Sequence, residues 1–112
     1  MPNPDTEFRA LQLLRVLERC SNVSQRELAN EIGLSVSRTN HVLRTLVEKG
    51  WVKAENFSQS PNKLGYLYLL TPAGVIEKMK LVRRFLIRKQ EEYDALAEEI
   101  AELEAELSEK EL

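Results

Sequence analysis

The stretch SQRELANEIGLSVSRTNHVLRTLVEKGWV, residues 24–52, decides the fold of this chain. It opens with a capping box, in which the Ser24 hydroxyl accepts the backbone N–H of Glu27 while the Glu27 side chain reaches back. A short helix follows over QRELANEI, and Gly33 ends it because glycine tolerates the left-handed conformation. The residues expected to face inward on this helix are Leu28, Ala29 and Ile32.

A second helix is predicted directly after this turn. Ser35 is suited to its N-cap, and the helical pattern runs to Lys49 before Gly50 ends it. Two helices joined by a tight turn that contains glycine are typical of a helix-turn-helix.

The helix from Ser35 to Lys49 has two faces of different chemistry. The stripe expected to pack inward consists of Val36, Thr39, Leu43, Leu46 and Val47, with Val42 at its edge. The opposite face carries Ser37, Arg38, Asn40, His41, Arg44 and Thr45, and it has no carboxylate before Glu48. Arginine pairs with guanine, asparagine with adenine, and serine or threonine with groove edges or phosphate, so this face favours duplex DNA. An ordinary solvated helix face is the alternative.

The segments on either side complete a winged domain. Upstream, a helix is predicted that begins after Pro4 or Asp5 and runs to Cys20, and its inward residues are Leu11, Leu14, Val16, Leu17 and Cys20. Downstream, WVKAENF and KLGYLYLL are rich in aromatic and branched residues and flank SQSPN, which predicts a hairpin. A hairpin behind a helix-turn-helix is a wing, so residues 5–71 are predicted to form a winged helix-turn-helix DNA-binding domain.

The predicted wing loop, NFSQSPNKLG, offers a second contact to nucleic acid. Its polar residues are Asn56, Ser58, Gln59, Ser60, Asn62 and Lys63. Such loops reach phosphate or the adjacent minor groove, where lysine adds affinity and little sequence information. A loop that is only solvated is the alternative.

A long C-terminal helix is predicted for residues 72–112, with Thr71 as its N-cap and Pro72 at the first helical position. A stripe with alternating spacings of four and three runs through Val75, Met79, Val82, Leu86, Lys89, Tyr93, Leu96, Ile100, Leu103 and Leu107. This is the pattern of a coiled-coil seam. From Pro72 to Lys110 the helix would be about 60 Å long, so a second copy of the chain is expected to cover it. The predicted dimerisation residues are Met79, Val82, Leu86, Tyr93, Leu96, Ile100 and Leu103.

Charge is distributed unevenly, although the formal net charge is only −2. Residues 1–76 carry nine Lys/Arg and seven Asp/Glu, residues 77–90 six and one, and residues 91–112 one and ten. A parallel helix pair would stack the acidic segment on itself, whereas an antiparallel pair crossing near residue 91 sets it against the basic segment. We therefore favour an antiparallel homodimer, whose two attachment points would lie roughly 50 Å apart. A direct phosphate contact by KMKLVRRFLIRK and a solvated helix without a partner are the alternatives.

Catalysis is not expected. The sequence offers no Ser/His/acid set and no glycine-rich phosphate loop, because its four glycines fall at turns or element ends. His41 is the only histidine and Cys20 lies on a different predicted helix, so neither a metal site nor a cofactor is predicted. A groove or phosphate contact is the favoured role of His41, and partial burial is the alternative. A redox role for Cys20 is disfavoured by its inward position.

The sequence also predicts a cytoplasmic location. A single cysteine excludes an internal disulfide framework and suits a reducing compartment. The N-terminal residues MPNPDTEF lack the pattern of a signal peptide, and the longest apolar run, LGYLYLL, is too short to span a bilayer.

These residues resemble the MarR-type winged-helix regulators, and more narrowly the small regulators associated with exopolysaccharide (EPS) gene clusters. The resemblance rests on SQRELA, KGWVK, the wing pattern NF..S.NK..Y.YLLTP.G and F..RK..EY, and it covers about residues 7–105. It implies dimerisation, transcriptional control and an exopolysaccharide link. The DNA contacts that it implies are Ser37, Arg38, Asn40, His41 and Arg44, with Asn62 and Lys63 on the wing. The chain is shorter than the general MarR plan, and no effector pocket is assigned.

The predicted function is a sequence-specific regulator of transcription that binds double-stranded DNA as a homodimer on an inverted-repeat operator. Ser35 and Thr45 join the candidate DNA contacts on the second helix of the helix-turn-helix. An adaptor that uses the winged helix and the coiled coil to bind protein is the alternative. The residues do not specify the operator, the regulated genes, the sign of regulation or an effector.

Overall fold

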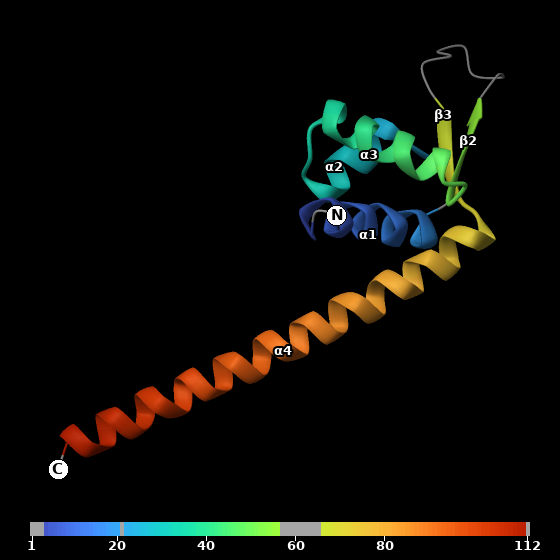
Figure 1. The fold of residues 1–112 in the computed structure, drawn as a ribbon. Helices are drawn as coiled ribbons and strands as arrows, with labels where there is room; N and C mark the ends of the chain where they lie inside the picture. Colours follow the sequence, from blue (N-terminus) through green and yellow to red (C-terminus); the bar gives the residue numbers. More distant parts are fainter. Residues whose placement is uncertain (1–3, 21, 57–65, 112) are drawn as a thin grey trace. The chain divides into compact units, whose positions relative to one another are not determined.

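The computed structural model describes residues 4–20, 22–56 and 66–111, and it is mainly helical with a small antiparallel sheet (Figure 1). The helices are α1 (Pro4–Arg19), α2 (Gln25–Ile32), α3 (Val36–Glu48) and α4 (Pro72–Lys110). The strands are β1 (Val23–Ser24), β2 (Val52–Asn56) and β3 (Tyr66–Leu70). The predicted fold class is confirmed: a helix-turn-helix and a hairpin precede a long C-terminal helix.

The chain divides into two compact units, Met1–Leu81 and Val82–Leu112. Residues 72–81 of α4 therefore belong to the first unit, whereas the sequence-based boundary follows residue 71. The assignment of DNA binding to residues 5–71 and of dimerisation to residues 72–112 stays a prediction.

The core of the first unit lies between α1, α2 and α3, which pack together as Figure 1 shows. Its most deeply buried apolar side chains are Leu11, Leu13, Leu14, Leu28, Leu43, Leu46 and Val52. Two predictions of burial were wrong. Cys20 is exposed, because α1 ends at Arg19 and the helical period no longer directs its side chain. Val36 is 45% exposed, because it is the first residue of α3 and lies at the edge of the packed face.

Both ends of α2 have the predicted chemistry. The backbone N–H of Glu27 donates to the Ser24 hydroxyl at 3.2 Å, and that hydroxyl donates to the Glu27 carboxylate at 3.0 Å. Gly33 has φ 67° and ψ 37°, the left-handed conformation that glycine adopts without a Cβ clash. The capping box and the glycine stop are both confirmed.

The sheet has the order β1-β3-β2, and both pairings are antiparallel. Tyr68 in the central strand lies opposite Val23 on one side and Ala54 on the other. β1 was not predicted, because a strand of two residues is too short to show a period of its own. It pairs with β3, the central strand of the sheet, and leads directly into α2.

The start of α4 is fixed to the rest of the first unit. The Thr71 hydroxyl accepts the backbone N–H of Gly74 at 3.0 Å, as predicted for an N-cap, and donates to the Gly50 carbonyl at 2.7 Å. Gly74 is needed at the third position of α4, since a methyl group there would collide with the carbonyl oxygen of Trp51. One turn later Lys78, only 15% exposed, pairs with Glu18 of α1 at 3.0 Å.

The second unit is the remainder of α4, and most of its large apolar side chains are exposed, whereas Val82 and Phe85 are half-buried. The exposed ones are Leu86, Ile87, Tyr93, Leu96, Ile100, Leu103 and Leu107. Within the described residues, no helix has the length and apolar character needed to cross a membrane.

Candidate nucleic-acid interface

α3 has a fixed orientation within the first unit. At its start the Ser35 side chain accepts the backbone N–H of Arg38 at 3.2 Å, which confirms Ser35 as the N-cap. Thr39, Leu43 and Leu46 are buried and anchor the inward face of the helix. Since three buried positions at helical spacing fix the rotation of a helix, the direction of its outward face is fixed as well.

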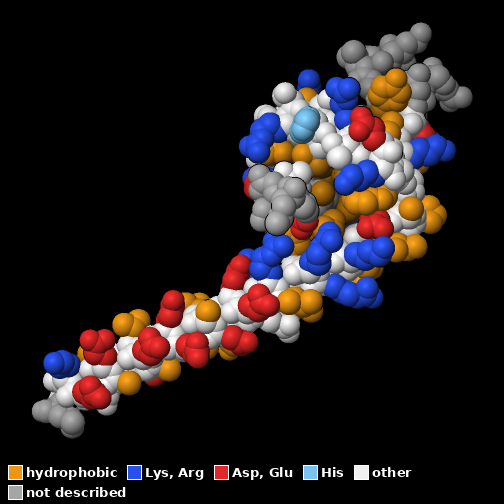
Figure 2. All heavy atoms as spheres, viewed as in Figure 1, with side chains coloured by type: hydrophobic (Ala, Val, Ile, Leu, Met, Phe, Trp, Pro, Cys, Tyr) orange, Lys and Arg blue, Asp and Glu red, His pale blue; other side chains and the backbone are white. Residues whose placement is uncertain are grey.

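The outward face of α3 carries most of the predicted candidates. Ser35, Ser37, Arg38, His41 and Arg44 are exposed, as the sequence indicates. Figure 2 shows the histidine, drawn pale blue, on a face where Lys and Arg side chains gather. Thr45, predicted on this face, is half-buried, and its hydroxyl donates to the carbonyl of His41 at 3.3 Å.

Asn40 also lies less open than expected. It is half-buried, and its amide nitrogen donates to Oε1 of Gln25 at 2.8 Å. The side-chain nitrogen of Gln25 donates in turn to the carbonyl of Val36 at 3.2 Å. Asn40 therefore helps to connect α2 and α3. Its side-chain amide oxygen can still accept a hydrogen bond from a ligand.

A groove of about 780 Å³ runs beside this joint. Its walls come from β1, the first turn of α2, one side of α3 and the hairpin, and its lining residues are Ser24, Gln25, Arg26, Val36, Asn40, Arg44, Val47, Glu48, Ala54, Tyr66 and Tyr68. Burial, and then the neighbouring Tyr66, raise the pKa of the Tyr68 phenol above its usual value. Two arginines, Arg26 and Arg44, thus border a groove whose walls are otherwise largely neutral.

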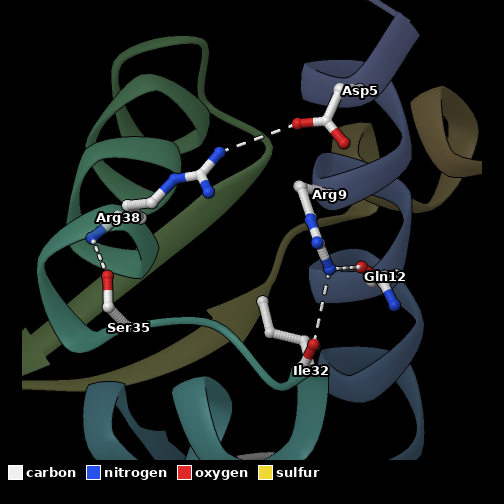
Figure 3. Close-up of polar contacts among 6 residues, drawn as sticks. All are labelled: Asp5, Arg9, Gln12, Ile32, Ser35 and Arg38. Carbon is white, nitrogen blue, oxygen red and sulfur yellow. Dashed lines mark hydrogen bonds and ion pairs between the residues drawn. The ribbon is translucent and has the colours of Figure 1, made fainter.

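Arg38 lies on the other flank of α3, toward α1, as Figure 3 shows. Its guanidinium nitrogen Nη2 lies 3.7 Å from Oδ2 of Asp5. The neighbouring Arg9 has a different role, because its Nη1 donates to Gln12 of α1 at 3.0 Å and to the carbonyl of Ile32 at 3.5 Å. The outward face of α3 therefore has Arg44 toward the groove and Arg38 toward α1.

The wing candidates Asn62 and Lys63 lie outside the described residues, as do Ser58, Gln59 and Ser60. Within the part of the chain that is described, no group of three His, Cys, Asp or Glu side chains is arranged to hold a metal ion.

A family model described as winged helix-turn-helix DNA-binding matches residues 9–53. These residues span most of α1, all of α2 and α3, and the beginning of β2. The first unit is a winged helix-turn-helix. In such a domain α3 is the second helix of the helix-turn-helix and the β2–β3 hairpin is the wing.

Solved structures of several transcriptional regulators are similar to this chain in fold. The PcaV transcriptional regulator from Streptomyces coelicolor is 22% identical, with a TM-score of 0.67 over 73% of this chain and 59% of its own. Wild-type MarR from E. coli is 22% identical, with a TM-score of 0.59 over 66% of this chain and 53% of its own. BldR from Sulfolobus solfataricus is 20% identical, with a TM-score of 0.62 over 74% of this chain and 59% of its own.

The chain thus shares the fold of these regulators while spanning a little over half of their length. A comparison with curated protein sequences gave no match.

Of the residues that line the groove, Asn40 and Arg44 were among the sequence-based candidates and the others were not. The side chains with hydrogen-bonding groups that were missed include Gln25, Arg26 and Tyr66. Gln25 and Arg26 follow the Ser24 cap directly, and helix N-termini are frequent phosphate contacts, so that position was an available signal. Nothing in the sequence pairs Tyr66 with α3, since their proximity depends on the packing of the hairpin.

Proposed function

We propose that the chain is a sequence-specific regulator of transcription that binds double-stranded DNA through α3 and the wing. The observation that carries this proposal is the outward face of α3, where Ser37, Arg38, His41 and Arg44 are exposed on a capped and anchored helix. An α-helix fits the major groove, and these side chains donate hydrogen bonds to base edges and phosphates. The winged helix-turn-helix fold supports the same docking geometry.

The candidate contacts have different chemistry. Arg38 and Arg44 are suited to guanine or phosphate, and His41 to a groove edge. Asn40 reaches adenine only by exchanging its bond to Gln25, while Ser35 and Thr45 contribute hydroxyls at the rim. Arg26, at the other side of the groove, is suited to a phosphate of the same strand. Asn62 and Lys63 remain candidates for the wing.

The regulator is proposed to act as a homodimer through α4. Six of the seven predicted seam residues are exposed, from Met79 at 44% to Tyr93 at 71%, and Val82 is half-buried. Apolar side chains that recur at a heptad spacing favour a second helix as their cover. In the antiparallel arrangement Leu86 pairs with Leu96 and Val82 with Ile100, and the basic segment lies against the acidic one.

The extent of the first unit shortens the distance between the two domains' attachment points in such a dimer. Because this unit continues to Leu81, the free length of α4 before a crossing near residue 91 is about 15 Å. The two attachment points of an antiparallel dimer are then about 30 Å apart rather than the 50 Å expected from the sequence alone. A two-fold dimer of this kind favours an inverted-repeat operator, because symmetry relates its two copies of α3.

The experiment that tests DNA binding is a salt titration. Fluorescence anisotropy of a labelled genomic duplex should report an affinity that falls steeply as salt rises, with a slope of about −0.9 for each phosphate neutralised. An adaptor that binds protein through an apolar surface would show no affinity for the duplex at any salt concentration. Because the sequence resembles EPS-associated regulators, exopolysaccharide genes are the first targets to examine. The protein is proposed to act in the cytoplasm, and no catalytic role is proposed.

A further inference from the structure

The ion pair between Arg38 and Asp5 connects α3 to the first turn of α1. The two side chains are 65% and 56% exposed, and their charged atoms lie 3.7 Å apart. Exposed pairs of this kind contribute little to folding, since water screens the charges and both side chains lose freedom. The main effect of the pair is therefore on the orientation of the Arg38 guanidinium.

Both ends of Arg38 are positioned. Its backbone N–H donates to the Ser35 cap, and its guanidinium contacts Asp5, as the dashed lines in Figure 3 show. Arginine has five N–H donors in a planar fork, so a contact at one nitrogen leaves another edge for a base. A side chain that is already oriented loses less conformational freedom on binding than a free one. Asp5 thus favours a duplex that has a guanine at the place where the fork points.

The same carboxylate also repels the phosphates of every duplex, whatever its sequence. It places a negative charge beside the outward face of α3, where the phosphates of bound DNA would lie. A duplex without a guanine at the matching position is repelled in the same way and forms no compensating hydrogen bonds with the Arg38 guanidinium.

We propose that Asp5 is a specificity-determining residue, which orients Arg38 for its base and penalises binding to all other sequences. The inference rests on the proposed function, and it assigns a role in sequence discrimination to α1, outside the helix-turn-helix. Asp5 acts through Arg38 and through its charge, so it is a positioning residue rather than a base contact.

The test compares two duplexes: one enriched from a random-sequence library by the wild-type protein, and one of the same composition with its sequence scrambled. Asp5→Asn, which keeps the size of the side chain and removes its charge, should lower the ratio of the two affinities about three- to ten-fold. Both parts of the ratio should move, with weaker binding of the enriched duplex and tighter binding of the scrambled one. Asp5→Glu should recover part of the ratio.

Two controls make the result specific. In an Arg38→Ala background, Asp5→Asn should no longer weaken binding to the enriched duplex, since there is no guanidinium left for Asp5 to orient. Glu31→Gln removes a carboxylate of comparable exposure, paired with Arg19 at 3.8 Å, and should leave the ratio unchanged. Thermal melting of each variant checks that it is folded.

The inference is overturned if Asp5→Asn preserves the ratio, or if it changes both affinities equally with and without Arg38. If the wild-type protein binds no duplex, the proposed function itself fails. If it discriminates between the duplexes and Asp5→Asn discriminates equally well, only the role of Asp5 fails.

Discussion

The side-chain amide of Asn40 donates a hydrogen bond to Oε1 of Gln25 at 2.8 Å, and Gln25 donates to the carbonyl of Val36 at 3.2 Å. One side chain in the first turn of α2 therefore contacts α3 at two places. The angle between the two helices is fixed by these polar contacts in addition to the apolar core, and it decides how the outward face of α3 meets a duplex.

Gln25→Ala and Asn40→Ala should each lower the free energy of unfolding by about 0.5–1.5 kcal/mol, because each removes a partner from a half-buried hydrogen bond. The double variant should lose at least about 0.5 kcal/mol less than the sum, since the second substitution removes a bond that is already broken. Urea denaturation measures all three values, with Asn30→Ala on the exposed side of α2 as the control. Strict additivity would show that the two side chains do not interact in solution.

Arg26→Ala should weaken binding to all duplexes alike and reduce the magnitude of the salt slope by about 0.9, because Arg26 is proposed to contact a phosphate rather than a base. Arg19→Ala removes the same charge from the end of α1, away from the groove, and serves as the matched control. Binding isotherms at four or five salt concentrations give the slopes. If both variants change the slope equally, Arg26 contributes only to the net charge of the domain.

The fold could be predicted from the sequence because its signals are local. The Ser24 and Ser35 caps, the stop at Gly33 and the start of α4 at Thr71 each depend on residues within one turn of one another. Helical periodicity also identified the buried residues of α2 and those of α3, although the stripe predicted for α3 included Val36, which is exposed.

The errors lie where a contact joins segments distant in the sequence. Asn40 was assigned by helical period alone, whereas its partial burial accompanies a contact with Gln25 of α2 and a place in the groove. Asp5 was not a candidate, because its contact with Arg38 arises only when α1 packs beside α3. Periodicity gives the direction of a side chain, and the neighbouring element decides how far it is covered.

Gly74→Ala should destabilise the first unit by about 1–3 kcal/mol. Alanine ordinarily favours a helix over glycine by about 1 kcal/mol, but here its methyl group would meet the backbone carbonyl of Trp51 and the Leu70 side chain, 2.7 Å away. Thermal unfolding followed by circular dichroism measures the loss, and the exposed Ala73→Ser should stay within about 0.5 kcal/mol. An unchanged or raised melting temperature would mean that α4 does not pack this closely on Trp51.

The orientation of the proposed dimer can be tested with single cysteines in a Cys20→Ser background. Leu86→Cys and Leu96→Cys should each fail to form a disulfide with itself, whereas a mixture of the two proteins should form a mixed dimer. This follows because residue 86 faces residue 96 of the second copy in an antiparallel seam and faces residue 86 in a parallel one. Non-reducing gels measure the products, and Ala95→Cys, off the seam, is the control. Disulfides within each single-variant sample would establish the parallel arrangement.

The central claim is that the outward face of α3 binds the groove of a duplex. Its most direct test is the selection of bound fragments from a random-sequence duplex library at low salt, with wild-type protein beside a variant in which Arg38, His41 and Arg44 are alanine. We expect the wild-type protein to enrich an inverted repeat whose half-sites are about one helical turn apart, and the variant to enrich none. A wild-type pool that stays as random as the starting library would contradict the account.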